Sequence, residues 1–216
     1  MISSSKTSPI ESIENAVDAI ITRSKAKPSP KDLVSLLLKI EKTAKSREDN
    51  YTLKRLVGDW RLCFITGTKK TRQQAGIALG AGRYLPKLVQ IQLSYTPIAP
   101  EDDRVTDSTS SQSFETGWVK NQVKLGSLQL ILTGPTKFLK KNNILAFDFT
   151  RITVRVFGAR IYDGYIRGGS DREREFDGIS VGKQAFFNYF WIGERAIAAR
   201  GRGGGLALWV LDSQSA

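Results

Sequence analysis

The sequence predicts a mainly β protein: a closed, antiparallel, up-and-down β-barrel preceded by a helical hairpin. Three observations lead to this prediction. Two amphipathic helical segments come first, many short segments with alternating apolar residues follow, and no helical crossover separates those segments. Strands joined without crossovers pair antiparallel, and closing such a sheet removes its exposed edges. We therefore expect a helical hairpin over residues 1–50 and a barrel domain over residues 51–216.

Both helical segments carry start signals. Ser8–Ser24 places isoleucine and valine at three- and four-residue intervals, with Ser8 as the N-cap and a proline at the first helical position. The second helix begins at Ser29 or Pro30 and fades in the polar stretch Lys45–Asn50. We expect both helices to pack on their own domain, although amphipathic helices also suit a membrane surface.

The first strand follows Gly58. Trp60, Leu62 and Phe64 recur at every second position, so we expect their side chains on one face. A Gly-x-Trp sequence that opens the first strand is typical of lipocalin-type barrels. Cys63 is the single cysteine, which excludes an internal disulfide, and its place in the strand indicates a small core residue.

The rest of the chain predicts further strands and turns. Val89–Thr96 alternates most clearly, and other strands are expected at Phe114–Leu125, Ser127–Thr133, Ile144–Phe149, Ile152–Phe157, Tyr162–Ile166, Ala185–Ile192, Ile197–Arg200 and Leu206–Leu211. We expect Gly134-Pro135 to end one strand. Gly67–Gly82 is expected to form a mobile lid or a short helix at the barrel mouth, and Thr106–Ser113 a loop or weak edge strand. Gly168–Glu175 is expected to be an exposed, flexible loop.

Composition narrows the function. The chain has no histidine, which excludes His-based acid–base catalysis and His-ligated metal sites. Acids such as Asp148, Asp163 and Asp177 have no spacing that identifies a catalytic pair, so we expect no enzyme, no metal and no cofactor. The net charge of +12 suits a phosphate-bearing partner or simply a solvated basic surface. No apolar run has the roughly 20 residues that a membrane-spanning helix needs.

Two blocks resemble one family. Trp60–Thr66, after the step Leu56-Val57-Gly58, resembles the W-x-L-x-[FY]-T-[ST] strand of the plastid lipid-associated protein (PAP)/fibrillin family. Arg200–Leu208 is similar to that family's closing Arg-Gly-Asp-x-Gly block and apolar last strand. The chain departs from the pattern with Arg202 in place of an acid, Gly193 in place of an Asp and Ile197 in place of an Arg, and its last strand has a different aromatic pattern, as in a divergent member.

The resemblance implies a lipocalin-like barrel in chloroplasts (thylakoid, plastoglobule or stroma), or in the cytoplasm or at the thylakoid surface of cyanobacteria. It implies non-catalytic binding of an isoprenoid-type lipid, such as a prenylquinone, a carotenoid or a prenyl chain, with a peripheral membrane contact. One alternative is an interaction protein that supports an enzyme of prenyl-lipid synthesis. Another, less favoured, is a basic nucleic-acid-binding protein, because the run Arg200–Gly205 is similar to an RGG segment.

The alternating positions predict the lining of the barrel. The expected ligand-binding residues are Trp60, Leu62, Phe64, Ile91, Leu93, Tyr95, Leu130, Leu132, Phe147, Phe149 and Val154. Each of these side chains also suits a packed core, and that alternative stays open at this stage. We further expect Arg200 to stack on the indole of Trp60 and close one end of the barrel.

Overall fold

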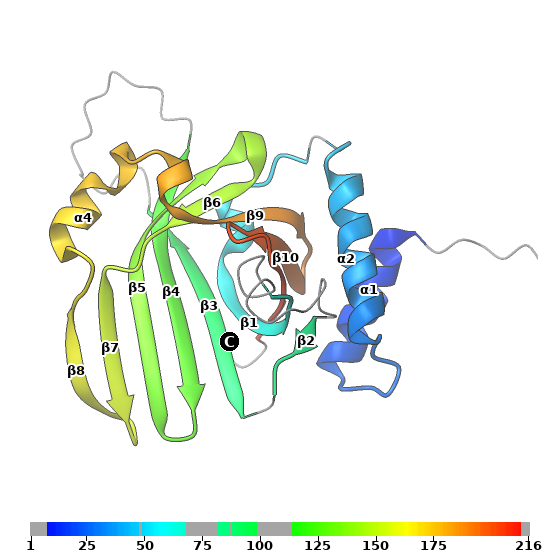
Figure 1. Ribbon diagram of the computed structural model, residues 1–216, viewed down its shortest axis with the longest axis horizontal. Helices are drawn as coiled ribbons and strands as arrows, with labels where there is room; N and C mark the ends of the chain where they lie inside the picture. Colours follow the sequence, from blue (N-terminus) through cyan, green and yellow to red (C-terminus); the bar gives the residue numbers. More distant parts are fainter. Residues whose placement is uncertain (1–7, 48, 68–81, 87, 99–113, 213–216) are drawn as a thin grey trace, which may run out of the picture.

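The computed structural model describes residues 8–47, 49–67, 82–86, 88–98 and 114–212 (Figure 1). Two of the predictions above fall outside this part of the chain. They are the lid or short helix expected at Gly67–Gly82, of which residues 68–81 lie outside the described ranges, and the polar stretch Thr106–Ser113.

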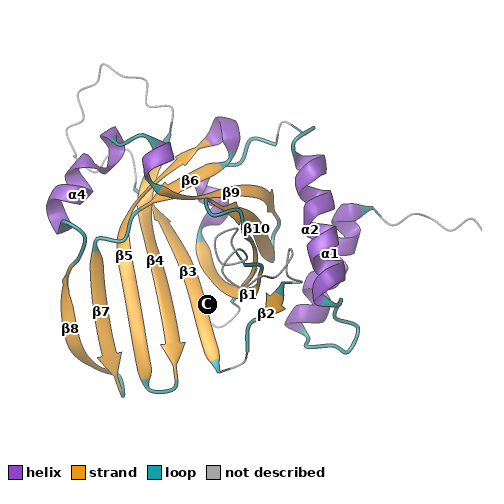
Figure 2. Ribbon diagram, viewed as in Figure 1, coloured by secondary structure: helices purple, strands orange, loops and turns teal. Residues whose placement is uncertain are grey.

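Eight antiparallel strands close into a barrel, which confirms the predicted fold class (Figure 2). Their bounds are β1 (Gly58–Ile65), β3 (Val89–Pro97), β4 (Glu115–Leu125), β5 (Leu128–Leu139), β6 (Ile144–Phe147), β9 (Ala185–Ile192), β10 (Ala196–Gly201) and β11 (Leu206–Leu211). Around the barrel they follow the order β4, β3, β1, β11, β10, β9, β6 and β5, and pairing of β5 with β4 closes the ring.

Among the described residues, three further strands lie outside the ring. The short β2 (Arg83–Tyr84) pairs with β1, while the hairpin of β7 (Arg151–Val156) and β8 (Ala159–Tyr165) extends the sheet beyond β5. The strands β3, β4, β5, β7 and β8 therefore form a five-stranded sheet that continues past the closed ring, on the side away from the helices (Figure 1). We call this sheet the flared wall.

The strand β5 changes its neighbour at Gly134 and Pro135. Its first half, up to Thr133, pairs with β7, and its second half, from Thr136, pairs with β6. Proline has no N–H to donate, so it is tolerated where a ladder is interrupted, and a Cβ at position 134 would collide with the carbonyl oxygen of Asp148. The prediction that Gly134-Pro135 ends the strand is therefore wrong, because the pair marks a fork within it.

The buried side chains form two cores, one on each side of the barrel wall. The inner core fills the barrel and contains Trp60, Tyr95, Tyr189 and Trp209. The outer core lies between the helices and the outer side of β1, β9, β10 and β11. A barrel wall that buries both faces explains why the last two strands are apolar at nearly every position.

A bulge in β1 sends consecutive apolar residues to different cores. The register of β1 against β11 shifts between Leu62 and Phe64: Leu62 lies opposite Trp209 of the inner core, and Phe64 lies opposite Leu208 of the outer core. The expectation that Phe64 shares the inner face of Trp60 is therefore wrong. An inserted residue turns every later side chain of a strand to the opposite face.

The helices α1 (Pro9–Ile21) and α2 (Pro30–Ala44) begin where the sequence predicts. Ser8 Oγ accepts a hydrogen bond from the N–H of Glu11 (3.1 Å), and Ser29 Oγ accepts one from the N–H of Asp32 (3.2 Å). Their apolar faces pack on the outer core. No helix in the described ranges is long and apolar enough to cross a bilayer.

A short helix, α4 (Gly169–Glu175), stands where the sequence predicts a flexible loop, so that prediction is wrong. Two contacts fix the helix to the barrel: Arg172 Nε donates to Asp148 (2.9 Å), and Thr150 Oγ1 donates to Glu173 (2.5 Å). Single turns of 3-10 helix complete the described chain: η1 (Leu53–Leu56), η2 (Lys140–Asn142), η3 (Phe176–Gly178) and η4 (Val181–Lys183).

Candidate ligand-binding site

The closed part of the barrel is filled by aromatic rings. The ring of Phe187 stacks on Phe147 with centroids 5.1 Å apart and meets Trp209 edge-on at 5.2 Å. The hydroxyl groups of Tyr95 and Tyr189 are 2.7 Å apart, and burial raises the pKa of both phenols. Of the predicted lining residues, Trp60, Leu93, Tyr95 and Phe147 belong to this packed core. A closely packed interior of this kind is a source of stability.

The apolar lining continues from the packed core onto the flared wall. Directly paired residues of neighbouring strands share a face, so the register arranges this face in rows. The rows, running outward from the core, are Leu93, Asn121, Leu132 and Ile152; then Ile91, Val123, Leu130 and Val154; then Val89, Leu125, Leu128 and Val156. We call these three rows the inner sheet face. Apart from Leu93, its side chains are only partly buried or exposed.

The other face of the flared wall is polar. Between the two outer rows, the register aligns Gln90, Lys124, Gln129, Arg155 and Arg160 across all five strands. Polar residues on one face and apolar residues on the other make the wall amphipathic, and only the apolar face is continuous with the barrel interior. The inner sheet face is therefore an accessible apolar surface built into the fold.

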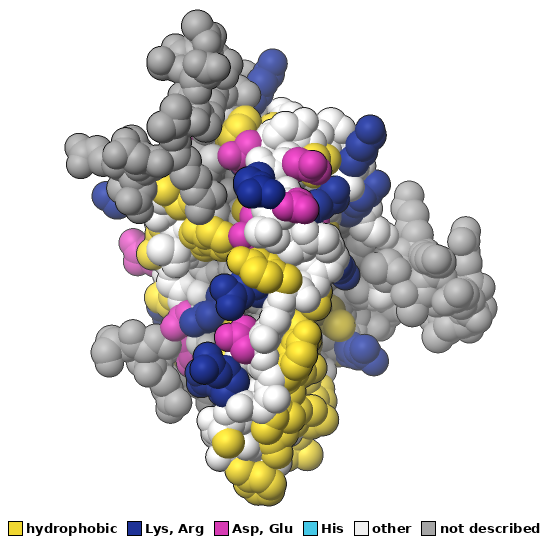
Figure 3. Space-filling view, turned by 90° about the vertical axis from the view of Figure 1, so that its left-hand side faces the viewer, with side chains coloured by type: hydrophobic (Ala, Val, Ile, Leu, Met, Phe, Trp, Pro, Cys, Tyr) yellow, Lys and Arg dark blue, Asp and Glu magenta, His cyan; other side chains and the backbone are white. Residues whose placement is uncertain are grey.

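The free end of the flared wall is also apolar. Leu88 is 80% exposed at the start of β3, Leu125 is 54% exposed in the β4–β5 hairpin, and Phe157 is 87% exposed in the β7–β8 hairpin. Figure 3 views the molecule from the side of β8 and shows a band of apolar side chains that runs down one side to the lower end, with Lys and Arg side chains beside it. Contiguous exposed apolar groups of this kind mark interaction surfaces.

The structure divides the predicted ligand-binding residues into two groups. Ile91, Leu130, Leu132 and Val154 come together on the inner sheet face, whereas Leu62 and Phe149 are partly buried and pack against the inner core. The sequence analysis missed other members of the face, such as Val123 and Ile152, although their alternation within the strands is the same signal.

Arg200 does not close the barrel over Trp60. Its Nε and Nη2 donate to the two carboxylate oxygens of Glu41 on α2, at 2.6 and 2.5 Å, and its Nη1 donates to the carbonyl oxygen of Gly204. Trp60 lies on the other side of the wall, where its indole N–H donates to Leu56 O (2.7 Å). The expected stacking is therefore wrong: Arg200 fastens the helical hairpin to the outer surface.

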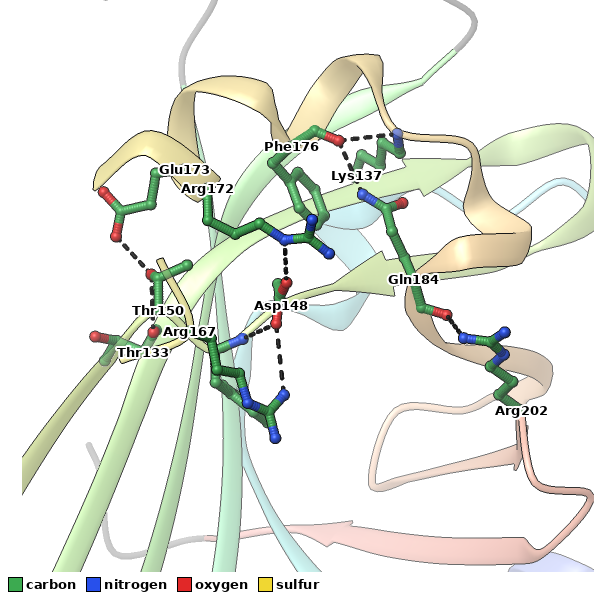
Figure 4. A network of polar contacts seen from close by, with 11 residues as sticks. Thr133, Lys137, Asp148, Thr150, Arg167, Arg172, Glu173, Phe176, Gln184 and Arg202 are labelled. Carbon is green, nitrogen blue, oxygen red and sulfur yellow. Dashed lines mark hydrogen bonds and ion pairs between the residues drawn. The ribbon is translucent and has the colours of Figure 1, made fainter. Parts of the chain in front are cut away.

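A polar network lies at the end of the inner sheet face (Figure 4). Asp148 accepts from Arg172 and pairs with Arg167 at 3.6 Å, and both arginines converge on its carboxylate. The backbone carbonyl of Asp148 lies over Gly134, one row beyond Leu132, so this residue is adjacent to the rows of the inner sheet face. From the sequence, Asp148 is only a candidate acid. The network could not be predicted, because Arg172 lies in the segment expected to be a flexible loop and Arg167 immediately precedes it.

Lys137 closes the far side of this network. Its Nζ donates to the carbonyl oxygens of Phe176 (3.3 Å), Asp177 (2.9 Å) and Ile179 (2.6 Å), so it holds η3 against β5. Burial lowers the pKa of this ammonium, while the charge of Asp177 opposes that change. Three carbonyl acceptors satisfy all three of its donors, which indicates a structural role.

Two pockets flank Arg202 in the β10–β11 hairpin. One, of about 530 Å³, is lined by Asp148, Arg167, Arg172, Lys183 and Arg202, with aromatic rings at its base. The other, of about 850 Å³, lies toward α2 and η2. The RGG-like run is thus part of an ordered hairpin, whereas RNA-binding RGG segments are disordered.

The described residues contain no group of three His, Cys, Asp or Glu side chains that would hold a metal ion. Comparison of the chain with protein-family models, with curated proteins and with solved structures finds no match in any of the three.

Proposed function

We propose that the protein is a non-catalytic binder of an extended apolar molecule of isoprenoid type, held against the inner sheet face. The observation that carries this proposal is the continuity of three rows that are apolar at every position except Asn121. They are partly exposed, with a packed aromatic core at one end and an exposed apolar edge at the other. Burial of apolar surface drives such binding at about 25 cal/mol per Å².

The proposal includes a peripheral contact with a membrane. Leu88, Leu125 and Phe157 are all exposed at the free end of the flared wall, and Lys124 and Arg155 lie nearby in the adjacent row of the polar face. Exposed apolar groups that enter the interface, beside cations that meet anionic head groups, suit a lipid surface. An apolar ligand would then pass from the bilayer onto the rows without crossing water.

Adjacent residues of β5 provide the test. Leu130 and Leu132 face the ligand in this proposal, whereas Ile131 lies between them on the polar face. We expect a short-chain prenylquinone to quench tryptophan fluorescence saturably, and Leu132→Gln to weaken its binding about tenfold, equivalent to roughly 1.4 kcal/mol of lost apolar contact.

Ile131→Gln is the matched control, because it makes the same change in the same strand without touching the inner sheet face. It should leave the affinity within a factor of about two. Equal losses in the two variants, or quenching that never saturates, would contradict the proposal.

A further inference from the structure

The pocket between α4, η4 and the β10–β11 hairpin gathers positive charge from four separate segments. Arg167 follows β8, Arg172 belongs to α4, Lys183 ends η4 and Arg202 lies in the hairpin. Among the described residues that line the pocket, Asp148 has the one carboxylate. Four cations and one anion in a concave site focus a positive potential into it, which raises the local concentration of anions.

The internal ion pairs leave much of this charge unmatched. Asp148 is only 12% exposed at its side chain and is shared between two guanidinium groups. Lys183 and Arg202 form no ion pair with any residue in the described ranges. Arg202 Nη1 donates to the carbonyl oxygen of Gln184 at 3.0 Å, and its other N–H groups remain available. An arginine fork and a lysine ammonium together suit a carboxylate or a phosphate.

The wall of the pocket also contains a buried acceptor. Gln184 donates through Nε2 to Phe176 O (2.8 Å), but its Oε1 has no hydrogen-bond partner among the residues that the structure describes. An amide oxygen only accepts hydrogen bonds, so this atom suits a water molecule or another donor and takes no part in holding an anion.

The pocket adjoins the inner sheet face. The rings of Phe147 and Phe187 line its base and also belong to the aromatic contacts of the barrel interior, where Phe147 touches Phe149 at 5.3 Å. The backbone carbonyl of Asp148 lies over Gly134, in the row next to Leu132. An apolar chain on the sheet face therefore ends beside the cations.

We infer that this pocket binds the anionic head group, a carboxylate or a phosphate monoester, of a long-chain amphiphile whose chain lies on the inner sheet face. The inference rests on the proposed function, which places the apolar chain of the ligand, and adds the chemistry of the ligand's head group. A free phosphate ion presents the same chemistry without the chain, and the experiment separates the two sources.

The test titrates the full chain with dodecanoate, dodecanol and inorganic phosphate, using calorimetry. We expect dodecanoate to bind at least about tenfold more tightly than dodecanol, because charge-assisted hydrogen bonds add to the same chain burial. Lys183→Gln/Arg202→Gln should remove that advantage and leave dodecanol binding unchanged. Lys183→Gln alone should reduce the advantage of dodecanoate in part. Its side chain has no partner among the described residues, so the substitution should not affect folding.

The control is Lys31→Gln/Lys39→Gln, which removes the same charge from exposed positions of α2 and should leave the advantage intact. Equal affinity of the wild type for dodecanoate and dodecanol would overturn the inference and leave the proposed function standing. Phosphate binding as tight as that of dodecanoate would assign the pocket to a free anion and also overturn it. Failure of both long-chain probes would contradict the proposed function, and the inference with it.

Discussion

Arg200 shows how one side chain joins distant parts of the chain. Its guanidinium binds both carboxylate oxygens of Glu41, a residue of α2 that lies 159 positions earlier. The side chain of Glu41 is only 15% exposed, so removal of the arginine leaves a carboxylate that water satisfies poorly. The hydrogen bond to Glu41 and its negative charge raise the pKa of Arg200, which stays charged. The pair thus fastens the helical hairpin to the barrel.

Arg200→Ala is expected to lower the free energy of unfolding by about 2 kcal/mol. The substitution removes the charge-assisted hydrogen bonds to Glu41 and leaves that carboxylate without its partner. A double-mutant cycle with Glu41→Gln should show a coupling of about 1 kcal/mol or more. The measurement is urea unfolding followed by circular dichroism. The matching cycle with Trp60→Phe should be additive, and coupling there would contradict the geometry described above.

Tyr84 makes stability depend on alkaline pH. Its hydroxyl donates to Pro28 O at 2.8 Å, and burial raises its pKa to about 12. A raised pKa in the folded state means that its contribution is present below pH of about 10, the unfolded value, and is lost as the pH rises through about 12. The phenol therefore helps to hold β2 to the helical hairpin at neutral pH.

Tyr84→Phe is expected to cost about 1 kcal/mol at pH 7, the value of one hydrogen bond. Between about pH 9 and pH 11 the variant should lose less stability than the wild type. In the wild type the phenol of Tyr84 ionises when the protein unfolds, whereas the phenylalanine of the variant has no group to ionise. Urea unfolding at these three pH values provides the measurement. Parallel losses in the two proteins would show that Tyr84 does not contribute.

At the scale of elements, the β7–β8 hairpin separates this molecule from a plain closed barrel. It pairs only with the first half of β5, and its turn presents Phe157 almost completely to solvent. Phe157 adopts a positive φ of 50°, beside Gly158, so the turn projects the ring away from the sheet. An apolar tip of this kind has no role in the folded core and fits an external apolar partner.

Phe157→Asp is expected to reduce association with vesicles of equimolar phosphatidylcholine and phosphatidylglycerol about tenfold, because one inserted aromatic ring contributes about 1.5–3 kcal/mol. Flotation of the vesicles with bound protein measures the effect. Leu38→Asp is the control, since Leu38 is 40% exposed on α2, far from the hairpin tips in the fold. Equal effects of the two substitutions would contradict the assigned contact surface.

Elements whose signals are local could be predicted from the sequence. The caps at Ser8 and Ser29 act within three residues, and the strands alternate over their own length. The errors concern distant contacts. Gly134-Pro135 looks like the end of a strand because the sequence shows only the local signal. That β5 continues, with β6 in place of β7 as its partner, depends on strands that come later in the chain. The helix α4 is held by Asp148, more than twenty residues before it.

The candidate site was partly predictable for the same reason. Alternation identifies Ile91, Leu130, Leu132 and Val154 as apolar positions of one face, and the pairing of the strands brings them together. Alternation does not tell a packed residue such as Tyr95 from an accessible one, because that difference arises only when the ring of strands closes. The cations near Asp148 come from four segments, and no spacing along the chain connects them.

At the scale of the whole molecule, stability and accessibility lie in different halves. The closed half contains the aromatic inner core and, on its outer side, the helical hairpin, so both faces of its wall are buried. The flared wall buries few of its side chains completely, and it presents an apolar face, a polar face and an apolar free edge. The net charge of +12 adds a long-range attraction toward anionic surfaces and ligands.

The fork at Gly134 and Pro135 has a consequence for how this protein can evolve. Beyond the fork, substitutions in the rows that carry Val123, Leu130 and Val154 alter the shape of an accessible surface without disturbing the buried rings. Such substitutions can therefore change the accessible face at little cost to the packing of the inner core. Homologues that keep the closed half should therefore differ most on the inner sheet face of the flared wall.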